Sequence, residues 1–235
     1  MKLLLLSNST NPGEAYLNYP KHNIQAFLGK ESMEVLFIPY AAVTFSYDEY
    51  EKKVSDRFSE LGYSIKGIHR FADPAEAVRN AKAIVVGGGN TWKLVRMLHD
   101  NGLISLVQEK VKSGTPYIGW SAGSNVACPT LRTTNDMPIV DPKTFDTFHL
   151  VPFQINPHYT DEHPANHGGE TREVRILEFI EQNPETFVVG LREGTMLWIE
   201  DSKIKLLGKR TARIFKKGRT TEELNNDSDF SFLLK

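Results

Sequence analysis

The sequence contains a single cysteine, Cys128, so a disulfide within the chain is impossible. One thiolate is also too few for a structural zinc site built from cysteines. The formal net charge is only −1, from 28 basic and 29 acidic residues. No overall positive field therefore favours nucleic acid or an anionic membrane surface, and we expect neither as a partner.

Long hydrophobic runs are also missing. The apolar run at residues 3–6 is too short for a signal-peptide core or a membrane span, and polar residues 7–10 follow it. We expect a buried first strand and a cytoplasmic protein. A chain of 235 residues with 40% hydrophobic residues can bury a sizeable core, so we expect one domain spanning residues 1–235.

Short apolar runs alternate with helical patterns through the first half. The runs lie at residues 3–6, 35–39, 65–69, 83–86 and 117–119. Several are unbroken, which is typical of parallel strands covered on both faces. Helical patterns cover 47–61 and 92–99, and Asp73-Pro74 is a typical helix start. The alternation predicts an α/β fold with a doubly wound, mostly parallel sheet.

The second half has a different pattern. Residues 132–169 are rich in turn formers and show little periodicity, which in a compact domain often marks a functional loop. We expect a helix at 170–182, then short strands at 187–191, 196–200 and 204–207. Asp201-Ser202 is a weak hairpin-turn signal because it lacks glycine. From residue 218 the chain is polar until Phe230, and we expect this segment to be loosely held.

The most informative segment contains Gly119-x-Ser121-x-Gly123, directly after a strand-like run and before a small-residue helix start. In this context the motif places a serine on a sharp, strained turn with its hydroxyl exposed. The amide of Ala122 would then face a developing oxyanion at the start of a helix. The motif alone also occurs in Gly/Ser-rich turns without chemistry, so the strand–turn–helix context carries the nucleophile hypothesis.

A nucleophilic serine needs a base, and the base needs a group that orients it. Among the 7 histidines, His158 follows a short apolar run and Pro157, which would direct its ring from a strand end. We interpret His163 and His167 as solvent-exposed loop residues. Asp136 and Glu193 both lie beside turn residues at expected strand ends. The residues alone leave open which acid orients the base.

The glycine triplet Gly87-Gly88-Gly89 ends an expected strand and opens a helix. It lacks the Gly-Lys-Ser/Thr ending of a phosphate-binding P-loop. Consecutive glycines let backbone amides approach a ligand closely. Beside a nucleophile turn, Gly88 or Gly89 could supply the second half of an oxyanion hole; a tight strand-to-helix turn is the simpler alternative.

Together these segments resemble peptidase E, the aspartyl dipeptidase family of serine peptidases. The resemblance rests on six pieces in family order, at residues 3–10, 86–91, 118–123, 132–142, 154–158 and 168–173. It implies a class I glutamine amidotransferase-like, flavodoxin-like fold. It also implies hydrolysis of peptides with an N-terminal aspartate, no metal and no cofactor. The small peptide is the expected partner, and the chain could be a monomer or a homodimer.

The resemblance also assigns roles by position. Ser121 is the expected nucleophile and His158 the base. The orienting acid falls on Asp136, which we place first because its segment matches over a longer stretch, or on Glu193. A pocket for the aspartyl carboxylate needs a cation or several donors. We expect Arg172 there, with Asn90 and Arg132 as weaker candidates.

Two other function classes remain open at this stage. An α/β-hydrolase esterase also uses Gly-x-Ser-x-Gly, but the chain lacks an obvious His-Gly-Gly-Gly segment, and its best histidine does not lie near the C-terminus. A flavodoxin-like ligand-binding module without catalysis would instead use the glycine triplet to hold a phosphate or nucleotide.

Overall fold

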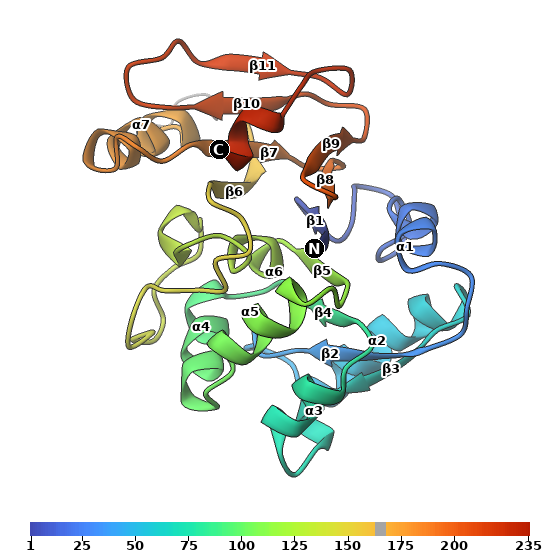
Figure 1. Ribbon diagram of the computed structural model, residues 1–235. Helices are drawn as coiled ribbons and strands as arrows, with labels where there is room; N and C mark the ends of the chain where they lie inside the picture. The colour runs from blue at the N-terminus through green and yellow to red at the C-terminus, as the bar shows by residue number, and fades with distance from the viewer. Residues whose placement is uncertain (163–167) are drawn as a thin grey trace.

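The computed structural model describes residues 1–162 and 168–235, so His163 and His167 lie outside the described residues. A seven-stranded sheet forms the centre, with strand order β3-β2-β4-β5-β1-β8-β9 (Figure 1). Its first five strands in this order are parallel, β8 is antiparallel to β1, and β9 is antiparallel to β8. The strands are β1 (Lys2–Leu6), β2 (Glu34–Ile38), β3 (Ser64–Gly67), β4 (Ile84–Val86), β5 (Tyr117–Trp120), β8 (Met196–Glu200) and β9 (Lys203–Leu207).

Helices cover both faces of this sheet, as the alternating pattern predicts. Helices α1 (Lys21–Leu28) and α2 (Tyr47–Ser59) pack on the face that carries Leu4 and Leu6. Helices α3 (Pro74–Asn80), α4 (Thr91–Asp100), α5 (Ile104–Lys112) and α6 (Ala122–Asn125) pack on the face that carries Leu3 and Leu5. Alternate leucines of β1 therefore enter two separate cores, which explains why this strand is an unbroken apolar run.

Local signals fix several helix starts. The Asp73 side chain accepts hydrogen bonds from the amides of Ala75 and Glu76 at the start of α3. The Asn90 side chain caps α4 by accepting a hydrogen bond from the amide of Lys93. The start at Asp73 confirms the sequence prediction, and α4 includes the helix expected at 92–99. Helices α1 and α5 were not predicted.

A second sheet, with order β11-β10-β7-β6, corrects the expectation of a single sheet. Its strands are β6 (Gln154–Tyr159), β7 (Val188–Arg192), β10 (Ala212–Phe215) and β11 (Glu222–Leu224), and only β6 and β7 are parallel. With helix α7 (Arg172–Gln182) it lies at one end of the molecule (Figure 1). The expected helix at 170–182 begins later, because Thr171 is its N-cap.

The C-terminal segment is more ordered than its polarity suggested. Strand β11 lies within it, and the final 3-10 helix η3 (Ser231–Leu234) follows Phe230. Phe230 and Leu233 are fully or almost fully buried in the larger core. The expectation of a loosely held tail from residue 218 was therefore wrong, because two apolar side chains anchor its end.

The β8–β9 hairpin confirms the weak turn signal. Asp201 and Ser202 have φ of 51° and 60°, the left-handed conformation that a two-residue hairpin turn requires. The short 3-10 helices η1 (Ile68–Arg70) and η2 (Leu131–Thr133) complete the regular elements. None of the helices in the described parts of the chain is long and apolar enough to cross a membrane.

Candidate active site

Ser121 occupies a strained turn between β5 and α6. Its φ of 53° and ψ of −113° are unusual for a residue with a side chain, and such strain is concentrated at functional sites. The turn is tight because a Cβ on Gly119 would overlap the carbonyl of Gly123, and one on Gly123 would overlap that of Val86. The two motif glycines are therefore required sterically, as the sequence predicts.

His158 also has a positive φ, of 54°, at an irregularity in the pairing of β6 with β7. Its amide donates to the Ser7 hydroxyl over 2.9 Å, and that hydroxyl donates to the Leu191 carbonyl over 2.7 Å. Ser7 is fully buried at the end of β1. Because of this bulge, the imidazole does not point to the face that regular strand alternation would give it.

Glu193 follows β7 directly. Because β6 and β7 are parallel neighbours, Glu193 lies next to the carboxyl end of β6. The next residue, Gly194, donates its amide to the Asn8 side chain over 2.9 Å. Ser7 and Asn8 thus hold the backbones beside the base and beside the glutamate. Sequence reasoning included both residues in a matching segment but assigned them no role. The available signal was their position directly after an apolar run; the structure shows that both are buried.

The structure brings three of the predicted side chains into one hydrogen-bonded chain. Nε2 of His158 lies 2.9 Å from Oγ of Ser121, and Nδ1 lies 2.6 Å from Oε1 of Glu193. The histidine and glutamate side chains are 38% and 40% exposed, so a substrate can reach them. The arrangement has the geometry of a nucleophile, a base and an orienting acid.

Asp136, the acid that sequence reasoning placed first, does not contact His158. Its Oδ2 atom instead accepts three hydrogen bonds: from the Thr91 amide at 2.7 Å, the Thr91 hydroxyl at 2.6 Å and the Thr134 hydroxyl at 3.0 Å. Of the two candidate acids, Glu193 and not Asp136 is hydrogen-bonded to His158 in this structure.

The glycine triplet lies against the serine. A Cβ on Gly88 would lie 3.0 Å from Cβ of Ser121. In the part of the chain that the structure describes, the amides of Gly88, Gly89 and Ala122 donate no hydrogen bond. The buried Tyr50 hydroxyl donates to the Gly88 carbonyl over 2.9 Å, which fixes the orientation of the Gly88–Gly89 peptide. Free amides beside a serine hydroxyl are the donors that an oxyanion hole needs.

Two cavities meet at His158. The smaller, of about 330 Å³, is lined by Ser121, Asp136 and Arg172, among others. The larger, of about 800 Å³, extends past Glu193 toward Lys209 and Arg210 and also includes Arg172. Burial lowers the pKa of Arg172, as does the neighbouring Arg175, whereas the Asp136 carboxylate acts to raise it. Arg172 and Asp136 are therefore opposite charges that influence each other at the smaller cavity.

The two weaker substrate-binding candidates lie elsewhere. The Asn90 side chain caps α4 and donates to the Met137 carbonyl over 2.9 Å. The Arg132 guanidinium stacks 4.7 Å from the centre of the Phe145 ring. Neither residue lines the two cavities found among the described residues at His158, so the geometry does not support the substrate contacts expected of them.

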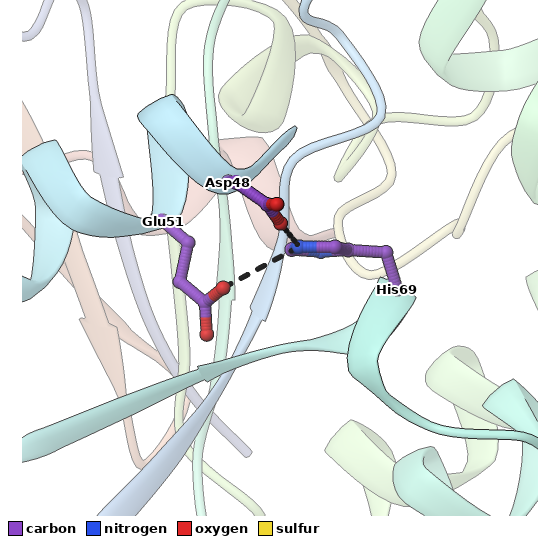
Figure 2. A group of neighbouring side chains, drawn as sticks. All are labelled: Asp48, Glu51 and His69. Atoms are coloured by element: carbon purple, nitrogen blue, oxygen red, sulfur yellow. Dashed lines mark hydrogen bonds and ion pairs between the residues drawn. The ribbon is translucent and has the colours of Figure 1, made fainter. Parts of the chain in front are cut away.

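A separate group of titratable side chains joins α2 to η1 (Figure 2). Nε2 of His69 lies 2.9 Å from Asp48 and 3.3 Å from Glu51. Three such ligand types within 4.8 Å could in principle hold a metal ion. Arg70 already pairs with both carboxylates at 2.8 Å, however, so the group is explained as an ion-pair network between two elements.

Comparison with known proteins shows the family to which the chain belongs. The model of Peptidase family S51 matches residues 3–207, and the chain belongs to that family. A peptidase E from Nostoc sp. is 52% identical over 234 residues, covering 100% of this chain and 97% of the relative. A peptidase E from Salmonella newport is 49% identical over 93% of this chain and 95% of its own length.

The fold also has a solved counterpart. The crystal structure of a peptidase from an acI-B1 Actinobacterium matches 98% of this chain and 96% of its own, with a TM-score of 0.72 at 20% identity. At that identity the likeness concerns the fold alone. Membership of the S51 family favours a peptidase over both the α/β-hydrolase esterase and the non-catalytic binding module.

Proposed function

We propose that this chain is a serine dipeptidase that hydrolyses the peptide bond after an N-terminal aspartate, with Ser121 as nucleophile. The observation that carries the proposal is the hydrogen-bonded chain from Ser121 through His158 to Glu193, with distances of 2.9 and 2.6 Å. The S51 family and the peptidase E relatives support the reaction class.

The reaction follows from this arrangement. The Nδ1–H group of His158 donates to Glu193, which leaves Nε2 to accept the proton of the Ser121 hydroxyl. The serine oxygen attacks the carbonyl carbon of the N-terminal aspartyl residue. The negative oxygen that develops accepts hydrogen bonds from the free amides of Ala122 and of Gly88 or Gly89. His158 then protonates the leaving amine, and water hydrolyses the aspartyl ester.

Selectivity for aspartate is assigned to Arg172. Its guanidinium lines the cavity beside Ser121 and is partly buried, which strengthens a charge-assisted hydrogen bond to a carboxylate. Substrate side chains without a carboxylate would leave this guanidinium without its partner, and a site built around a specific polar contact rejects such analogues strongly.

The substrate preference is tested with a panel of Asp-X, Asn-X, Glu-X and X-Asp dipeptides. Asp-X turnover should exceed that of Asn-X by about 10²-fold or more. Arg172→Met should lower kcat/KM for Asp-X by a similar factor, while Arg175→Met on the same helix serves as the matched control. Equal turnover of Asp-X and Asn-X by the unmodified protein would refute the carboxylate pocket.

We also propose that residues 1–235 form one domain with a class I glutamine amidotransferase-like, flavodoxin-like fold. The parallel strands of the first sheet, the helices on both faces and a nucleophile at the carboxyl end of β5 support this. The lone Cys128 fits a reducing compartment, so we propose a cytoplasmic location. The active form would be a monomer or a homodimer.

A further inference from the structure

Asp136 presents a free carboxylate oxygen at the cavity beside Ser121. Its Oδ2 atom takes all three hydrogen bonds from Thr91 and Thr134. Within residues 1–162 and 168–235, no hydrogen bond reaches Oδ1. The side chain is half-buried and lines the same cavity as Ser121 and Arg172. One oxygen therefore fixes the carboxylate while the other remains available to a ligand.

The carboxylate of Asp136 is not the only anchor between its loop and α4. Two other contacts already hold that loop. Trp92 donates its indole N–H to the Asp136 carbonyl over 3.0 Å, and Asn90 donates to the Met137 carbonyl over 2.9 Å. A carboxylate in addition brings a negative charge to a cavity where the proposed substrate also carries negative charge. Arg172 offsets this charge in the free protein, and once Arg172 pairs with the substrate carboxylate, a cation of the substrate can take over that role.

We infer that Asp136 binds the α-ammonium group of the substrate. This inference rests on the proposed function, because it deepens the recognition of the same substrate. The α-ammonium of an N-terminal residue is attached next to the carbonyl that Ser121 attacks, so it must enter the cavity together with that carbonyl. The aspartyl residue then offers one cation and one anion, and the cavity offers Asp136 and Arg172 in return.

Recognition of the ammonium group has two consequences for the substrate. It restricts cleavage to the first peptide bond, because an internal residue has a neutral amide at that position. It also orients the substrate, since Asp136 repels the β-carboxylate and directs it toward Arg172. Asp136 is thus a specificity-determining residue, and Glu193 is the acid that acts on the base.

The test compares two anilides that differ in one group. Aspartyl p-nitroanilide carries the ammonium, and its desamino analogue, succinyl mono-p-nitroanilide, has hydrogen in its place and keeps the β-carboxylate. The unmodified protein should prefer the aspartyl compound in kcat/KM by about 10- to 10²-fold, the usual worth of a hydrogen bond between charged groups. Asp136→Asn should lose this preference, because its loss of kcat/KM should be about 10-fold or more larger on the aspartyl compound than on the succinyl compound.

Three controls separate this role from others. Arg172→Met should lower activity on both anilides and keep the ratio, because both carry the carboxylate. Glu193→Gln should also lower both equally. Asp141→Asn, an exposed acid further along the same loop, should change neither. If Asp136→Asn fails to fold by circular dichroism, Asp136→Ser takes its place, because it also removes the charge and keeps a short polar side chain at the start of α4.

Each outcome bears on one claim. An equal loss on both anilides in the folded Asp136 variants would overturn the ammonium role and indicate a structural or catalytic one. Equal rates of the unmodified protein on both anilides would overturn it too, while leaving the proposed hydrolysis in place. No hydrolysis of any aspartyl substrate would instead contradict the proposed function itself.

Discussion

Nδ1 of His158 lies 2.6 Å from Oε1 of Glu193, and this contact is a consequence of sheet pairing. The two residues come from the ends of β6 and β7, which are parallel neighbours, with Pro157 opposite Leu191 in the register. Because the carboxyl ends of parallel strands share an edge, the glutamate after β7 reaches the histidine at the end of β6. The pairing of the second sheet thus brings the glutamate next to the histidine.

Glu193→Gln should reduce kcat by about 10³- to 10⁴-fold, because an amide cannot stabilise the imidazolium that forms during attack. Steady-state kinetics on an Asp-X dipeptide measures the effect. Glu193→Asp, which keeps the charge but is shorter, should lose less. A Gln variant with nearly full activity would remove Glu193 from the orienting role.

Ser7→Ala should impair both stability and catalysis. The Ser7 hydroxyl is buried and bonds both the His158 amide and the Leu191 carbonyl, so its loss leaves two buried polar groups unpaired. We expect a loss of about 1–3 kcal/mol in the free energy of unfolding and a lower kcat. Urea unfolding and kinetics measure the two effects, with the half-buried Ser9→Ala as control. An unchanged kcat would show that Ser7 does not position the base.

Tyr50→Phe should lower kcat by about 10-fold with little change in KM. Without the hydroxyl, the Gly88 carbonyl loses its buried donor and the neighbouring Gly89 amide loses its fixed direction. Tyr47→Phe, on the same helix, is the matched control. A Tyr50 variant that is less stable but keeps its kcat would show that this tyrosine contributes only to packing.

Acid should weaken the second sheet through Glu223. Its hydrogen bond with Arg192 holds the pKa of the Glu223 carboxyl below its usual range, despite the opposing effect of burial. A lowered pKa contributes stability above the unfolded value of about 4.3, and that contribution is lost as pH falls through the folded-state pKa. Glu223→Gln should therefore lower Tm at pH 7, and the difference should shrink below about pH 4.

The exposed neighbour Glu222, for which the described residues provide no ion pair, is the control for this prediction. Glu222→Gln should leave Tm nearly unchanged across the same range. A Tm difference between Glu223→Gln and the unmodified protein that persists unchanged at low pH would show that the Arg192 ion pair is not its source.

Much of the site could be predicted because its signals are local. The turn around Ser121 depends on two flanking glycines and a strand–turn–helix sequence, and both are visible in the chain. The histidine at the end of β6 follows an apolar run and a proline. The choice between Asp136 and Glu193 depends on which strand pairs with β6, and no local pattern contains that information.

The second sheet could not be predicted for a similar reason. Strands β10 and β11 carry charged residues such as Arg213 and Glu223, and their charges are paired across strands within the folded protein. On the sequence such residues suggest a solvated segment. The buried anchor Phe230 is isolated in a polar stretch, so its contribution appears only once the chain has folded around it.

The proposed hydrolysis depends most directly on the Ser121 hydroxyl. The decisive measurement is kcat/KM of the unmodified protein and of Ser121→Ala on an Asp-X dipeptide, with circular dichroism to verify that both are folded. We predict that removing this oxygen lowers the rate by about 10⁴-fold or more. A folded alanine variant that still hydrolyses Asp-X at a rate near that of the unmodified protein would contradict the proposed chemistry.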